Sequence, residues 1–116
     1  MLVWQKSMKL LVEIYRLVQL LPKTEMYGLA DQMRRAVVSI PANIAEGKGR
    51  DSDREFIRFL SISRGSCSEL ETHLEACLLV GYLNESDVKD AFSLLDEVGK
   101  MLSSLMKKLK NLASKV

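Results

Sequence analysis

The sequence has very few of the side chains on which metal sites, disulfides and most catalytic centres depend. Its 116 residues include one histidine and two cysteines. A dinuclear carboxylate site in a helical bundle needs paired Glu-x-x-His motifs, and His73 has no second histidine to pair with. Cys67 and Cys77 have no further ligands at the spacing of a zinc site. We therefore expect no metal ion, no cofactor and no enzymatic activity.

Long apolar runs are also missing. Lys9, Glu13 and Arg16 interrupt the apolar start of the chain, which excludes a signal peptide. No segment approaches the roughly 18 uninterrupted apolar residues of a membrane span. Cys67 and Cys77 would lie about 15 Å apart along one helix, which is beyond disulfide reach. These features predict a protein in a reducing, cytoplasmic setting that has no membrane partner.

Proline and glycine are scarce as well, with two and six residues, and helical periodicity fills the segments between them. Apolar residues recur at spacings of three and four along residues 3–21, 29–44, 56–80 and 88–112. No segment alternates with the period of a β-strand. We predict an all-α protein with a single domain over residues 1–116, folded as an up-down-up-down antiparallel four-helix bundle.

Residues typical of helix ends separate the four predicted helices. Pro22 should end the first helix, because a proline pushes the residue before it out of helical geometry. Thr24 should cap the second helix, and Ser52 should open a capping box for the third. Gly81 should stop the third helix, and Asn84 should cap the fourth.

The first predicted helix has an apolar face that is wider than one neighbouring helix would cover. One stripe consists of Val3, Leu10, Ile14, Leu17 and Leu21. A second stripe beside it consists of Trp4, Met8, Leu11, Tyr15 and Val18. Either two helices of the same chain share this face, or another subunit covers part of it.

A polar stripe follows one side of the second predicted helix, at spacings of three and four, and ends at Arg50. The matching side of an antiparallel third helix is also polar. Because polar groups among apolar neighbours need hydrogen-bond partners, we predict that the two helices share a network, with Arg35 linked toward Glu69. It forms within one chain or across a subunit boundary. Its predicted members are Gln32, Arg35, Ser39, Asn43, Glu46, Ser66 and Glu69.

Charge is unevenly distributed, although the net charge is only +2. Residues 1–50 carry eight Lys and Arg against four acids, residues 51–97 carry four against eleven, and residues 98–116 carry five lysines and no acid. Any basic surface must therefore combine the two ends of the chain. The alternative is that these cations are only the solvated ends of helices. The candidate nucleic-acid contacts are Lys48, Arg50, Lys107, Lys108 and Lys110.

Two long stretches carry a resemblance to a known family. The strings GLADQMRRAVVSIPANIAEGKGR and EFIRFLSISRGSCSELETHLEACLLVGYL resemble the four-helix-bundle proteins encoded in intervening sequences of bacterial 23S ribosomal RNA genes. The string Asn43-Ile44-Ala45-Glu46-Gly47 is the most specific part of the match. The resemblance implies a small, cytoplasmic, non-enzymatic bundle that assembles as a homopentameric ring. The family is similar to the accessory protein of diversity-generating retroelements, a pentameric bundle that binds nucleic acid and its reverse transcriptase.

Two classes of function follow from the residues and the resemblance together. The first is an RNA-associated accessory protein, whose partner would be a structured RNA or a nucleic-acid enzyme and whose basic ends are gathered by oligomerisation. The second is a protein-interaction or assembly module without a nucleic-acid role. Salt-dependent binding of structured RNA distinguishes the first class from the second.

Overall fold

The computed structural model describes residues 1–114, which form four α-helices and one short 3-10 turn. The helices are α1 (Leu2–Val18), α2 (Leu29–Lys48), α3 (Asp53–Val80) and α4 (Glu85–Ser114), with the turn η1 (Lys23–Glu25) between α1 and α2. The predicted all-α fold with four helices is confirmed. Within residues 1–114, no helix combines the length and the apolar content that crossing a membrane requires.

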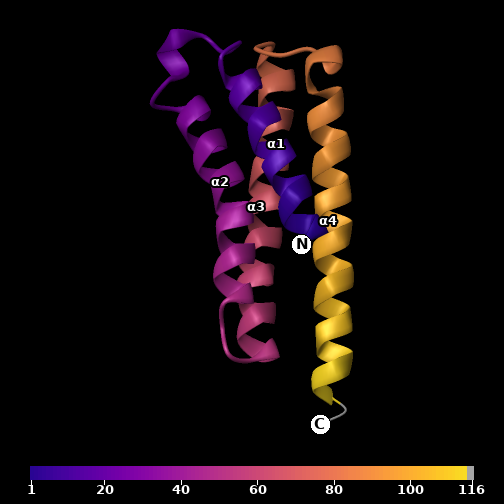
Figure 1. The fold of residues 1–116 in the computed structure, drawn as a ribbon. Coiled ribbons are helices and arrows are strands. Elements are labelled where there is room, and N and C mark those ends of the chain that lie inside the picture. Colours follow the sequence, from indigo (N-terminus) through magenta and orange to yellow (C-terminus); the bar gives the residue numbers. More distant parts are fainter. Residues whose placement is uncertain (115–116) are drawn as a thin grey trace.

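Successive helices run antiparallel, so that the chain goes up, down, up and down along one long axis (Figure 1). Each helix packs against two others: α2 lies against α1 and α3, and α4 lies against α3 and α1. This closed order brings one apolar stripe of every helix to the common axis. The largest fully buried side chains are Leu10, Ile14, Leu17, Met33, Val37, Ile40, Ile44, Leu60, Leu70, Leu74, Val98 and Leu102.

The first connection differs in detail from the sequence prediction. α1 ends at Val18, before the predicted end at residue 21. The amide of Leu20 donates to the carbonyl of Leu17 at 2.9 Å, and the amide of Leu21 donates to that of Val18 at 3.2 Å. These bonds span three residues, so the chain tightens into a turn before Pro22.

Glu25 takes the capping role that the sequence suggested for Thr24, because α2 starts later than predicted, at Leu29. The Oε1 atom of Glu25 accepts a hydrogen bond from the Leu29 amide at 3.2 Å. Its Oε2 atom accepts one from the Tyr82 hydroxyl at 2.9 Å. This bond to the carboxylate raises the pKa of Tyr82. One side chain thus fixes the start of α2 to the turn between α3 and α4.

The ends of the other helices follow the predicted pattern. The Ser52 hydroxyl accepts a hydrogen bond from the Glu55 amide at 3.1 Å at the start of α3. Gly81 ends α3 with a left-handed φ of 84°. At the start of α4, Asn84 Oδ1 accepts from the Asp87 amide at 2.9 Å, and Asp87 Oδ2 accepts from the Asn84 amide at 3.0 Å. This reciprocal pair is a complete capping box.

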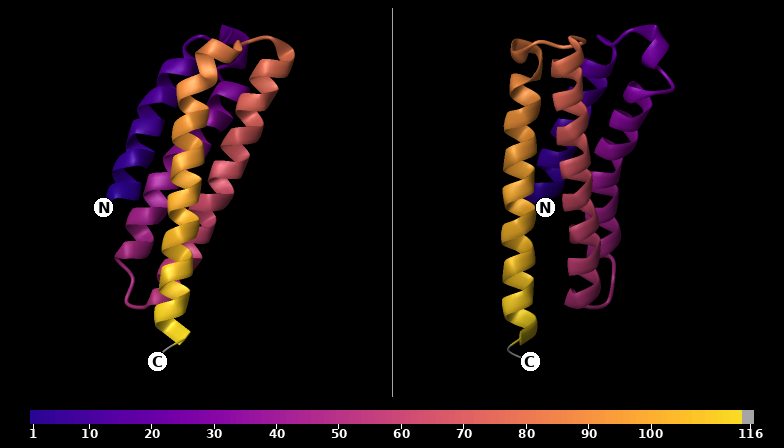
Figure 2. Two further views of the ribbon diagram at one scale, coloured as in Figure 1. Left: turned by 90° about the vertical axis from the view of Figure 1, so that its right-hand side faces the viewer. Right: turned by 180° about the vertical axis from the view of Figure 1, so that it is seen from behind.

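α1 is much shorter than the helix on which it packs. It has 17 residues, whereas α4 has 30. The N-terminus therefore lies beside the middle of α4, and the lower part of the bundle consists of α2, α3 and α4 (Figures 1 and 2). A salt bridge of 2.8 Å between Lys6 and Glu97 fixes the level at which α1 meets α4.

Candidate interaction surface

Part of the polar stripe on α2 bonds directly to α3. The Ser66 hydroxyl donates to the Ser39 hydroxyl at 2.9 Å. The Asn43 amide nitrogen donates to the same hydroxyl at 3.0 Å and to the Ser39 carbonyl at 2.8 Å. Nearby, the buried Ser63 hydroxyl donates to the Ile40 carbonyl at 2.8 Å. The bonds from Ser66 and Ser63 join α3 to α2 through neutral groups, whereas those from Asn43 lie within α2.

The charged residues of the stripe have other partners. Glu46 pairs with Arg50 at 2.7 Å, four residues later and just beyond the end of α2. Glu69 lies 3.2 Å from the His73 ring, four residues further along α3. In both cases the partner is four residues away in the sequence and within easy reach, so neither carboxylate needs a contact with another helix.

Arg35 and Glu69 do not meet within the chain. Both side chains are exposed, as is Gln32, and over residues 1–114 no hydrogen bond or ion pair joins Arg35 to Glu69. The network within one chain is therefore smaller than the sequence suggested, and it centres on Ser39. The physical reason is that these long side chains reach water at the outer edge of the α2–α3 contact and lose no hydration there.

Replacing Ser66 with alanine should test this small network. We expect the free energy of unfolding to fall by about 1 kcal/mol, because the Ser39 hydroxyl loses its donor across the interface. Ser68→Ala is the matched control, because Ser68 is exposed on the same helix, and its substitution should change stability by less than about 0.5 kcal/mol. Urea denaturation measures both changes, and equal values for the two variants would contradict the proposed bond.

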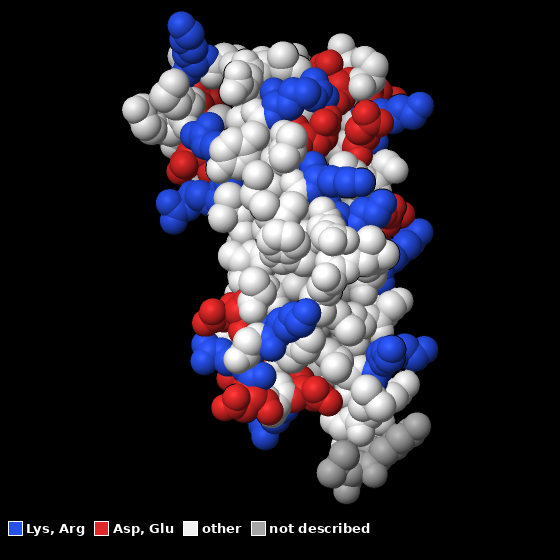
Figure 3. Space-filling view, in the orientation of Figure 1, with Lys and Arg blue, Asp and Glu red and all other residues white. Residues whose placement is uncertain are grey.

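An uncharged surface covers the outer side of α1 and α2. We call it the α1–α2 face, and it consists of Trp4, Met8, Leu11, Tyr15, Val38, Ala42 and Ala45. Trp4 and Tyr15 are each 38% exposed, and Val38 is 41% exposed. Residues 36–45 of α2 contain no charged side chain. Figure 3 shows the result, which is a broad uncharged area across the middle of the molecule with charged side chains above and below it.

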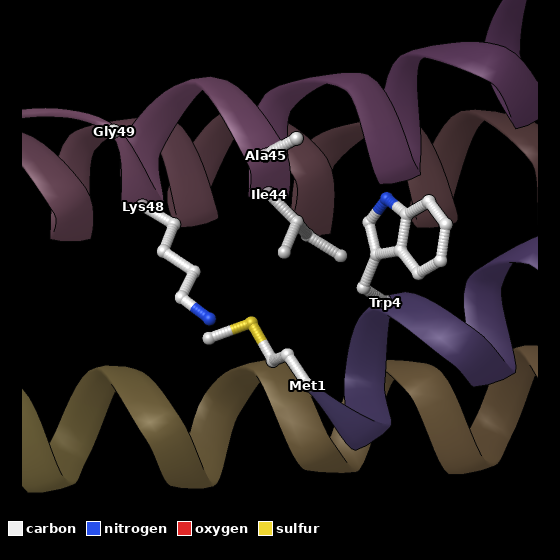
Figure 4. Close-up of a pocket in the computed structure, with 6 residues that line it drawn as sticks. All are labelled: Met1, Trp4, Ile44, Ala45, Lys48 and Gly49. Atoms are coloured by element: carbon white, nitrogen blue, oxygen red, sulfur yellow. The ribbon is translucent and has the colours of Figure 1, made fainter.

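A hollow continues this face where α1 begins. Its lining comes from Met1 and Trp4 of the N-terminal segment and from the last turns of α2. Figure 4 shows the Lys48 side chain extending from α2 toward Met1, with Ile44 beside Trp4. Helical periodicity alone does not predict this hollow, although the unequal lengths of the first and fourth predicted helices were a usable signal.

The candidate nucleic-acid contacts all lie toward the lower end of the bundle, where α2 and α4 end (Figure 1). Lys48 lines the hollow, whereas Arg50 is paired with Glu46 and lies 5.0 Å from the centre of the Phe59 ring. The remaining three side chains are exposed on the last turns of α4, and no ion pair involves them within residues 1–114. They are Lys107, Lys108 and Lys110.

The two cysteines and the single histidine do not form a metal site within the described residues. Over residues 1–114, no three His, Cys, Asp or Glu side chains converge on a point where a metal ion would bind. Cys67 and Cys77 are free and buried. Burial, with a smaller contribution from the Glu71 carboxylate, raises the pKa of the Cys67 thiol to about 12. Burial likewise raises the pKa of Cys77.

Both thiols should therefore resist modification in the folded protein. With a pKa of about 12, Cys67 has a thiolate fraction on the order of one in ten thousand near pH 8. We expect the aromatic disulfide reagent DTNB to label neither cysteine in buffer and both in denaturant. Rapid labelling of native protein, followed by absorbance of the released thiolate, would show that one thiol is accessible.

Comparison with known proteins assigns the chain to a family. The sequence pattern of the family described as "23S rRNA-intervening sequence protein" matches residues 1–104. The chain belongs to this family. It is also similar to a crystal structure from Bacteroides thetaiotaomicron, described as a protein of unknown function from the S23 ribosomal protein family. The two chains share 28% identity and a TM-score of 0.84, over 90% of this chain and 98% of the other. No curated protein matches the chain.

The assignment confirms the resemblance seen in the sequence. The family description refers to a gene location and names no reaction or ligand. The structure from Bacteroides thetaiotaomicron is likewise described as having unknown function. What the protein does must therefore be inferred from its surfaces.

Proposed function

We propose that this protein is a non-enzymatic assembly module that forms a homo-oligomeric ring in the cytoplasm, with five subunits as the expected number. The main support for the proposal is the α1–α2 face. There the side chains of Trp4, Tyr15 and Val38 are each more than a third exposed on an uncharged helix surface. Contiguous exposed apolar patches of this kind are typical of protein interfaces. Burying them against a neighbour contributes about 25 cal/mol for each Å² of apolar area.

A ring with more than two subunits joins two different faces of each chain. The α1–α2 face would then meet another side of the neighbouring chain. Arg35 and Glu69, which do not pair within the chain, are our candidates for an ion pair between neighbours. This assigns the outer part of the polar stripe to the subunit boundary, which was the second of the two predicted arrangements.

Light scattering coupled to gel filtration tests the ring directly. A pentamer of 13.1 kDa chains has a mass of about 65 kDa, since five times 13.1 is 65.5. A monomer at micromolar concentration would contradict the proposal. Such a result would also remove the α1–α2 face as a self-association surface.

The second candidate function is that of an RNA-associated accessory protein. The observation in its favour is the basic end of α4, which has three exposed lysines and no acid after Glu97. A ring would present this weak patch several times, so that it acts as a multivalent surface. Binding of a structured RNA should weaken steeply as salt rises, because each phosphate contact releases counterions. Absence of binding at low salt by the assembled oligomer would exclude this role.

A further inference from the structure

A ring requires a second contact surface on each chain, and its geometry limits where that surface lies. In a ring of five, neighbouring subunits are rotated by about 72°, so the two contact surfaces of one subunit face directions about 108° apart. Adjacent sides of a four-helix bundle face directions about 90° apart, and opposite sides about 180° apart. The α1–α2 face therefore suits a contact with an adjacent side, which is either the α2–α3 side or the α4–α1 side. Contact with the opposite α3–α4 side would produce an open chain of subunits.

Charge favours the α2–α3 side of these two. On the α4–α1 side, Lys6 and Glu97 already pair within the chain at 2.8 Å. On the α2–α3 side, Arg35 and Glu69 are both exposed and do not pair with each other within the chain. Their charges are complementary between two copies of the chain, one of which supplies Arg35 and the other Glu69.

A second hollow lies at the end of the α1–α2 face nearer the start of α2, and it is positively charged. Its lining includes Tyr15 of α1 and Arg34, Arg35 and Val38 of α2. Asp31 also lines it and pairs with Arg34 at 3.8 Å. Within residues 1–114 this pairing leaves Arg35 as the cation of the hollow that has no ion pair. We call this space the Arg35 hollow.

The outer edge of α3 next to α2 carries a stripe that matches this surface. We call it the α3 stripe, and it consists of Ile62, Ser66, Glu69 and His73, at spacings of four, three and four. Ser66 fixes its position, because the Ser66 hydroxyl bonds to Ser39 of α2. Ile62 is 42% exposed, and the Glu69 side chain is 50% exposed. The α3 stripe therefore presents an apolar side chain and an acidic side chain to the outside of the bundle.

The acidic residue of the stripe and the Arg35 hollow lie at the same level along the bundle. Ser39 and Ser66 are bonded to each other and mark one level. Toward the end where α2 begins, Arg35 lies four residues from Ser39, or about 6 Å, and Glu69 lies three residues from Ser66, or about 4.5 Å. Rotation about a ring axis parallel to the helices keeps each residue at its own level. Glu69 of one subunit can therefore enter the Arg35 hollow of the next.

The apolar residue of the stripe lies level with the uncharged part of the α1–α2 face. Ile62 lies four residues before Ser66, about 6 Å toward the other end of the bundle. A similar distance from Ser39 along α2 reaches the level of Ala42, an exposed residue of the α1–α2 face. Residues 36–45 around it contain no charged side chain. In a ring of this kind, an apolar side chain thus meets an uncharged surface.

We infer that the α3 stripe of one subunit docks on the α1–α2 face of the next, with Glu69 in the Arg35 hollow and Ile62 against the uncharged part of the face. This inference rests on the ring proposed above and names the second surface that the ring needs. The partner is a second copy of this chain, because opposite charges and apolar groups match at equal levels on two adjacent sides of one bundle. Docking also gives the Tyr15 hydroxyl, which lines the same hollow, an acceptor in the Glu69 carboxylate.

Two variants that are each blocked on one surface test this docking. Val38→Glu blocks the α1–α2 face, and Ile62→Glu blocks the α3 stripe, so each variant alone should be a monomer of 13.1 kDa. Mixed in equal amounts, they should form a complex of two chains with a mass of about 26 kDa, twice 13.1 kDa. The intact stripe of the first variant binds the intact face of the second, and the two blocked surfaces prevent further growth. Light scattering measures the masses over a concentration series that extends well above the assembly range of unmodified protein.

Ser61→Glu is the matched control for Ile62→Glu. Ser61 is the preceding exposed residue of α3, about 100° around the helix from the stripe, and its substitution should leave the oligomer mass unchanged. Circular dichroism should show equal helix content for all three variants.

A charge exchange tests the ion pair independently. Arg35→Glu places a carboxylate opposite Glu69 of the neighbour, so the concentration needed for half-assembly should rise at least about tenfold. Adding Glu69→Arg to the same chain restores opposite charges and should bring that concentration back toward its original value.

Three results would overturn the inference. An Ile62→Glu protein that keeps the full oligomer mass would show that the α3 stripe lies outside the contact. A mixture that stays at 13.1 kDa would show that the two surfaces do not bind each other. A double charge variant that assembles no better than Arg35→Glu would remove the ion pair. A monomeric unmodified protein would instead remove the ring itself, so the two proposals fail separately.

Discussion

Replacing Gly47 with alanine is expected to destabilise the bundle by about 1 to 3 kcal/mol, although alanine is the better helix former. Gly47 is buried in α2 where this helix packs against the start of α3. A Cβ atom added there would lie 2.7 Å from the Cβ of Phe59 and 3.3 Å from the carbonyl oxygen of Phe56. Neither of these atoms is the mobile end of a side chain, so the two helices must move apart.

Two other glycines provide matched controls for this substitution. Gly65 lies within α3 and Gly99 within α4, and a Cβ atom added at either would meet no atom within 4 Å. Alanine at each should therefore stabilise the protein by about 0.5 to 1 kcal/mol through its helix propensity. Thermal or urea denaturation measures whether each alanine lowers or raises the free energy of unfolding. A stabilising Gly47→Ala would show that α2 and α3 are not in close contact at this point.

Replacing Val38 with glutamate is expected to convert the assembled protein to monomers. Val38 is 41% exposed at the centre of the α1–α2 face, so the chain itself tolerates a charge there. In a ring this carboxylate would lose its hydration, which costs on the order of several kcal/mol at each interface. It would also draw Arg35, three residues earlier on α2, away from the Glu69 of the neighbouring subunit. The mass measured by light scattering should fall from about 65 kDa to 13.1 kDa.

Leu79→Glu is the control for this change. Leu79 is 86% exposed near the end of α3, away from the α1–α2 face, and its substitution should leave the oligomer intact. Circular dichroism should show the same helix content for both variants. A Val38→Glu protein that keeps the full oligomer mass would place the subunit contact on another face.

The four helices and their order could be predicted because the relevant signals are local. Apolar spacings of three and four identify each buried stripe, and residues such as Ser52 and Asn84 act within one turn of the helices they cap. The first connection was predicted less well. Thr24 is a good capping residue by type, but Glu25 takes the role because Tyr82, more than fifty positions away, holds its carboxylate in place.

The candidate surfaces depend on contacts between helices, and the pattern of residues along a single helix does not specify these contacts. The bundle, the polar stripe on α2 and the basic end of α4 could be predicted, since each is a pattern along single helices. Tertiary packing settles which polar residues bond across helices, how close Gly47 brings α2 to α3, and where the short α1 leaves a hollow beside Trp4. The physical reason is that these features arise from the relative level of neighbouring helices. Packing of side chains from distant parts of the chain sets that level.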